Sequence, residues 1–139
     1  MAAFVRFLAD QKLPCTVSLS QGASRSVEQN KLQRLWLAEI ADQLGDQTRE
    51  QIRGYCKLHL GVPILREENE EFRVSYDRVI KPLAYEFKIE SMMEPLDFPV
   101  TRLMTSKQKA QYLDEVHRHF SERGITLTNP DDLRFGNAA

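Results

Sequence analysis

The chain has 139 residues, of which 42% are hydrophobic and 28% charged, and its formal net charge is −1. This size and composition predict one globular domain, and the near-zero net charge excludes a generally basic surface for nucleic acid. No apolar run approaches the roughly 20 residues that cross a bilayer, and the start MAAFVRFLADQ lacks the pattern of a signal peptide. Its two cysteines, Cys15 and Cys56, have no disulfide spacing. We therefore expect a cytoplasmic protein with no membrane contact.

Two short runs near the N-terminus are rich in β-forming residues. FVRFL at 4–8 and CTVSLS at 15–20 alternate in polarity, and Pro14 can open an edge strand before the second run. The sequence therefore predicts a two-stranded start and a turn at 21–24. The predicted fold class is α+β, with short N-terminal strands followed by about four helices.

The first predicted helix runs over 27–44. Apolar residues recur there every four positions: Leu32, Trp36, Ile40 and Leu44. Ser26 and Gln29 have the spacing of a capping box, which would place the helix N-terminus and its free amides at Ser26. Gly45 is predicted to end the helix. Trp36 is interpreted as a core anchor, with base stacking as the alternative.

The remaining elements follow from caps and breakers. A second helix is predicted at 48–60, ended by Gly61 and Pro63, and helix is expected on both sides of Pro82. The segment 95–105 should be extended, either as a strand or as a loop.

The last predicted helix begins after a cap at Thr105 or Ser106 and is closed by Gly124. Its expected buried face consists of Tyr112, Leu113, Val116 and Phe120. A polar, partly mobile tail is predicted from about residue 128, although Ile125 and Leu127 before it have the character of packed residues.

Six cations lie in and around the first two predicted helices: Arg25, Lys31, Arg34, Arg49, Arg53 and Lys57. The last three are spaced i, i+4, i+8 and share one helix face. Such a row is either an ordinary solvated face or a stripe that tracks the phosphates of a polyanion. We name all six as candidate nucleic-acid-binding residues.

Signals for catalysis or metal binding are weak. The sequence has no glycine-rich phosphate loop, no HExxH motif and no paired cysteines for zinc. Glu39 and Asp42 could share a helix face and hold a divalent metal, so a metal-dependent nuclease is a minority hypothesis. The acidic run REENEE at 66–71 is better explained as a solvated segment than as a metal site. We predict no catalytic residues, no metal and no cofactor.

Asn30 is not explained by helix formation alone. It is a poor helix former and lies beside the buried stripe of the first predicted helix, in line with Arg34. It therefore needs a hydrogen-bond partner, either the backbone of a neighbouring loop or a ligand.

Two stretches carry a resemblance to a known family. RSVEQNKLQRLWLAEIADQL resembles the helix-opening motif of the NinB family of phage recombination proteins, and DFPVTRLMTSKQKAQYLDEVHRHFSERGITLTNPDD is similar to the end of that family. The motif positions are occupied by Arg25, Ser26, Gln29, Asn30 and Trp36. The resemblance covers about residues 13–131, although 61–95 does not match, and implies a single NinB-like domain over 1–139.

The resemblance implies an α+β homodimer that binds DNA and prefers single strands. It also implies a non-enzymatic recombination mediator of phage or prophage origin, which helps to load a strand-exchange protein where the host single-strand-binding protein coats the DNA. An alternative is an adaptor that docks on a replication or recombination protein without contacting DNA itself.

Overall fold

The computed structural model describes the backbone of residues 16–130, with side chains from residue 26 onward. Within this range the chain is helical and contains no β-strand, so the predicted α+β class is wrong. The elements are α2 (Thr16–Leu44), α3 (Arg49–Cys56), the π-helical η1 (Lys57–Gly61), α4 (Val62–Glu68), α5 (Glu70–Val79), α6 (Tyr85–Ser91), the 3-10 turn η2 (Thr101–Leu103) and α7 (Ser106–Ser121).

The N-terminal prediction failed because α2 begins much earlier than expected. Residues 16–20 of the second predicted strand and the predicted turn at 21–24 are helical, while 4–8 and Cys15 lie outside the described residues. Once a helix is nucleated, each added residue costs little, so a short β-prone run can extend it. Ser26 consequently lies inside α2, and neither the predicted capping box nor a free helix N-terminus exists there.

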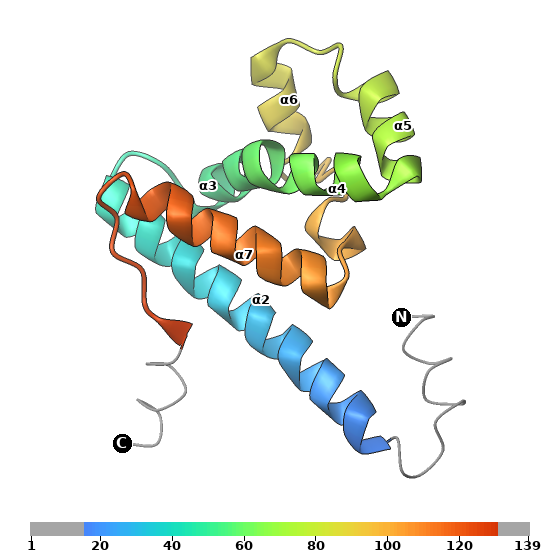
Figure 1. Cartoon of the computed structure of the whole chain (residues 1–139). Coiled ribbons are helices and arrows are strands. Elements are labelled where there is room, and N and C mark those ends of the chain that lie inside the picture. The colour runs from blue at the N-terminus through green and yellow to red at the C-terminus, as the bar shows by residue number, and fades with distance from the viewer. Residues whose placement is uncertain (1–15, 131–139) are drawn as a thin grey trace.

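α2 and α7 lie side by side and run in the same direction (Figure 1). Gln29 of α2 contacts the start of α7, and Trp36 packs on His117 farther along it, with ring centroids 5.3 Å apart. The first core cluster lies between these helices and α3, and Trp36 is 3% exposed within it. The core-anchor interpretation of Trp36 is confirmed.

The second predicted helix does not end at Gly61 and Pro63. α3, η1 and α4 follow one another without a break (Figure 1). In the π turn the Val62 amide donates to the Lys57 carbonyl, an i→i−5 bond that changes the hydrogen-bond spacing just before proline, which has no amide to donate. Gly61 has no side chain here because a Cβ would lie 2.8 Å from Val100 Cγ1.

Several local predictions are confirmed. Thr105, one of the two predicted caps, begins α7, and Gly45 and Gly124 follow α2 and α7 with positive φ angles of 81° and 86°. Thr48 and Thr105 each form a full capping box, which was not predicted. Pro82 separates α5 from α6.

A second core cluster is built mainly from η1, α4, α5 and the segment before α7. α5 and α6 lie on the opposite side of α3–α4 from the α2–α7 pair (Figure 1). The segment expected to be extended at 95–105 contains turns and η2 rather than a strand.

The segment after α7 returns along α2. Ile125 and Leu127 are buried, as predicted. The Thr128 carbonyl accepts a 2.8 Å hydrogen bond from Trp36 Nε1, and Glu39 accepts from the amide and hydroxyl of Thr128. The predicted tail therefore begins in a segment that is attached to α2. Between residues 16 and 130, no helix has both the length and the apolar character needed to span a bilayer.

Candidate functional site

A polar cleft of about 290 Å³ opens between α2 and the segment that leads into α7. Its lining combines amides, hydroxyls and two cations: Ser26, Gln29, Asn30, Gln33, Thr101, Arg102, Met104, Thr105, Ser106 and Lys109. None of these residues is an aspartate or a glutamate. The cleft is thus a positively charged hollow with many hydrogen-bonding groups.

Lys109 is the most unusual residue of this lining. It is 8% exposed, and its Nζ donates a 2.9 Å hydrogen bond to Asn30 Oδ1. It forms no ion pair with any residue in the described range. Burial lowers the pKa of Lys109 because the charged form loses hydration that no carboxylate replaces. An anion in the cleft would supply the missing counter-charge.

Gln33 is the second unusual residue. Its Oε1 is fully buried, yet it accepts no hydrogen bond, and it is the one such side-chain atom among the described residues. Leaving a buried acceptor without a donor costs roughly 1 to 3 kcal/mol. The residues that line the cleft therefore include a cation without a counter-charge and a side chain whose buried oxygen has no donor among the described residues.

Three of the five family-motif residues lie in the cleft: Ser26, Gln29 and Asn30. Gln29 Nε2 donates to the Ser106 carbonyl at 3.1 Å, so this side chain joins α2 to α7 and does not cap α2. Asn30 has a partner outside its own helix, as expected, but this partner is the side chain of Lys109 on α7 and not a loop backbone or a ligand. Trp36 lies in the core, and the side chain of Arg25 is outside the described residues.

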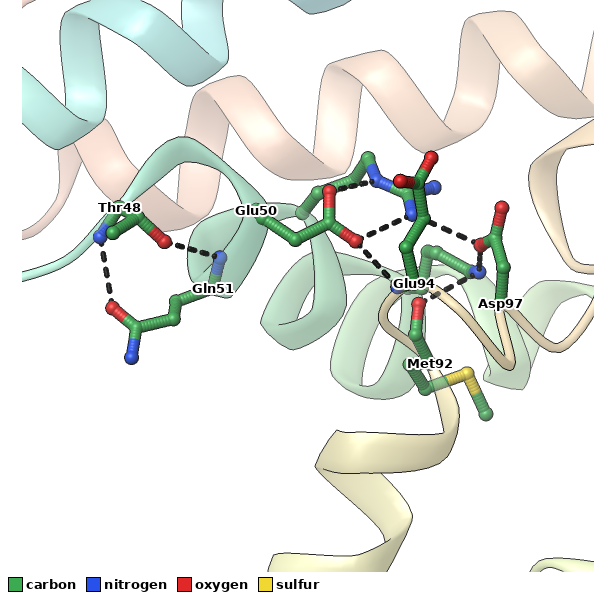
Figure 2. Close-up of polar contacts among 8 residues, drawn as sticks. Thr48, Glu50, Gln51, Met92, Glu94 and Asp97 are labelled. Carbon is green, nitrogen blue, oxygen red and sulfur yellow. Dashed lines mark hydrogen bonds and ion pairs between the residues drawn. The ribbon is translucent and has the colours of Figure 1, made fainter.

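The predicted stripe of Arg49, Arg53 and Lys57 does not face solvent as a unit. Lys57 is 2% exposed, and its Nζ contacts Asp97 Oδ1 at 2.5 Å and the Met92 carbonyl at 2.9 Å (Figure 2). Arg53 binds Glu50 through two hydrogen bonds and Asp97 through a third. The four charged side chains of this network, Glu50, Arg53, Lys57 and Asp97, sum to zero. Only Arg49 of the three is exposed and unpaired within residues 16–130.

Burial lowers the pKa of Lys57 despite its bond to Asp97, whereas the pKa shifts of the other three members agree with internal pairing. Burial alone would raise the pKa of Asp97, but hydrogen bonds from Lys57 and Arg53 hold it below its usual value. The hydrogen bond from Arg53 likewise lowers the pKa of Glu50 and raises that of Arg53. The network attaches the loop after α6 to α3 and η1, and Lys57 is not placed to meet a phosphate.

Lys31 and Arg34 are exposed on α2, and neither forms an ion pair within the described range. Arg34 is one helical turn beyond Asn30, so it lies at the rim of the cleft. Among the predicted cations whose side chains are described, none lines the cleft, and Lys31 lies on the face of α2 that points away from the cleft residues.

The residues proposed for a nuclease do not form a metal site. Glu39 is engaged by Thr128, as described above, and Asp42 is exposed on α2. No group of three or more potential metal ligands occurs between residues 16 and 130. Cys56 is fully buried, which raises the pKa of its thiol to about 12, so it serves as a small core residue.

Sequence reasoning missed Gln33, Arg102 and Lys109. A signal was present for two of them, because Lys109 occupies the buried stripe of α7 and Gln33 lies one turn before the buried Leu37 of α2. A polar residue at an apolar position of a helix indicates either an internal partner or a ligand. Arg102 carries no such pattern.

Comparison with protein-family profiles, curated proteins and solved structures finds no match to this chain. The helical structure of residues 16–130 also departs from the α+β fold that the NinB resemblance implies.

Proposed function

We propose that the protein is a non-enzymatic, cytoplasmic DNA-binding protein of homologous recombination in a phage or prophage, and that it binds single-stranded DNA at the cleft between α2 and α7. The observation that carries this proposal is the buried Lys109, which has no carboxylate partner and shares an acid-free cleft with Arg102. A backbone phosphate supplies the missing negative charge. The exposed Arg34, one helical turn beyond Asn30, adds a positive charge next to this cleft.

The role in recombination is supported by the motif residues alone. Ser26, Gln29 and Asn30 line the cleft, so the part of the sequence that resembles the NinB family coincides with the best candidate site. With that role come a homodimer and contact with the host single-strand-binding protein, both of which are tested by sedimentation of the purified protein alone and in mixture.

The DNA-binding proposal is tested by titrating the protein into a labelled single strand at about 50 and about 200 mM salt, a range over which phosphate contacts weaken strongly. We expect Lys109→Met to weaken binding about tenfold at low salt and to reduce the salt dependence. Lys81→Met removes the same charge from an exposed position far along the chain from the cleft and should bind as the parent protein does. No salt-dependent binding by the parent protein contradicts the proposal.

A second candidate function is an adaptor that docks on another protein. It is favoured by large apolar side chains that are exposed on and near α6, where Tyr85 is 55%, Phe87 54% and Leu96 68% exposed. An adaptor gives no salt-dependent signal in the same titration, so one experiment separates the two functions.

A further inference from the structure

We propose that the cleft holds one unpaired nucleotide, with its phosphate at Lys109 and Arg102 and its base hydrogen-bonded to Gln33. This inference rests on the proposed function, and it names the part of the strand that the cleft recognises. Two features of the lining support it: Lys109 has no anionic partner, and Gln33 Oε1 has no hydrogen-bond donor, among the described residues.

Lys109 and Gln33 would each bind a different group of the same ligand. Lys109 needs a negative charge, which a phosphate provides. The buried Oε1 of Gln33 needs a hydrogen-bond donor. Within a DNA strand, the phosphodiester oxygens only accept hydrogen bonds and the internal deoxyribose has no hydroxyl. The N–H groups of the bases are therefore the only donors that a strand can offer.

The base must be unpaired, because Gln33 requires an N–H group that is free to donate. In a duplex the Watson–Crick N–H groups are already paired, whereas in a single strand they are free to contact a side-chain amide. Asn30 lies one helical turn before Gln33, and its Oδ1 is occupied by Lys109, which leaves its Nδ2 as a donor toward a base. A rotation of the Gln33 side chain toward the cleft would bring its buried acceptor beside the Asn30 donor, where both would contact the edge of one unpaired base.

The size of the cleft suits this ligand. A volume of about 290 Å³ is at the lower end of the range for small-molecule sites and is too small for stacked base pairs. The direct consequence is that the preference for single strands depends on Gln33, whereas the salt dependence depends on Lys109.

The test compares three ligands of equal length in low salt: a thymine strand, the same strand with abasic sites, and the duplex. We expect the parent protein to bind the thymine strand about threefold to tenfold more tightly than the abasic strand, the effect of one hydrogen bond. Gln33→Met, which removes the acceptor at nearly constant size, should reduce this ratio to about one and lower the preference for single strands over duplex. Gln111→Met, at an exposed position of α7 outside the cleft, should leave both ratios unchanged.

These measurements distinguish failure of the nucleotide site from failure of DNA binding as a whole. If the parent protein binds the thymine and abasic strands equally, or if Gln33→Met keeps the difference, the nucleotide inference is overturned while DNA binding stands. If no strand binds, but thymidine monophosphate protects the parent protein and not Gln33→Met against heat, the nucleotide site is supported and the DNA-binding function falls. Binding of neither strands nor the mononucleotide overturns both.

Discussion

Lys57 and Lys109 are both buried lysines on helices, exposed by only 2% and 8%, but their surroundings differ in charge. Lys57 meets Asp97 and a carbonyl within a network that sums to zero (Figure 2). Lys109 meets only the neutral amide of Asn30, in a cleft without a carboxylate. A buried charge that is neutralised internally serves the fold, whereas one left without a counter-charge is a cost that binding can relieve.

The largest expected effect is on stability, from a substitution of Lys57 in the charge network. Lys57→Met should lower the free energy of unfolding by about 2 kcal/mol, less than for a fully buried pair because Asp97 is 31% exposed and keeps Arg53. Urea unfolding measures the change, with the exposed Lys81→Met as control. DNA affinity of the folded variant should match that of the parent protein, and a large loss of affinity would restore Lys57 as a phosphate contact.

The next largest effect is expected from removing the N-terminal caps of α3 and α7. Thr48 begins α3, which leads to Lys57, and Thr105 begins α7, which carries Lys109. Alanine at either threonine should reduce stability by about 1 kcal/mol because each hydroxyl accepts a backbone amide. Ser26→Ala lies within α2 and should change stability little. Equal losses at all three positions in urea unfolding would revive the predicted cap at Ser26.

Unlike Lys57→Met, Lys109→Met should not lower the free energy of unfolding. Removing an unneutralised buried charge should leave stability unchanged or raise it by up to about 1 kcal/mol, despite the lost bond to Asn30. Urea unfolding of this variant and of Lys57→Met under identical conditions gives the comparison directly. A loss comparable to that of Lys57→Met would mean that Lys109 serves the fold.

The smallest expected effect is on how stability changes as the pH falls. The pKa values of Asp97 and Glu50 are lower in the folded than in the unfolded protein, so the unfolded state takes up protons first as the pH falls. Their stabilisation is complete above the unfolded values near pH 4 and is lost below them. Asp97→Asn should flatten this part of the pH profile of stability, whereas Lys109→Met should not alter it. A parallel profile in Asp97→Asn would contradict the ion-pair assignment.

What could be predicted from sequence follows from how local the signals are. The cap at Thr105, the stripe of Tyr112 to Phe120 and the stop at Gly124 all act within a few residues, and the helix they predict is α7. The burial of Lys57 could not be predicted, because its partner Asp97 lies 40 residues away in a loop.

Two errors came from local signals that the wider structure overrode. The β-prone residues after Cys15 joined a helix that was already favoured downstream, and the breaking pair Gly61 and Pro63 was accommodated by a π turn. In the cleft, Lys109 could have been noticed as a cation in an apolar stripe. The gathering of Arg102 with Gln33 depends on how η2 meets α2, which no local pattern encodes.

The parallel course of α2 and α7 has an electrical consequence. Antiparallel neighbours cancel their helix dipoles, whereas two parallel helices add them. The positive end of α7 lies beside the cleft and that of α2 lies farther out on the same side, at Thr16, while both negative ends lie toward Gly45 and Gly124 (Figure 1). If the cleft binds DNA as proposed, this field would turn the cleft end of the protein toward the strand.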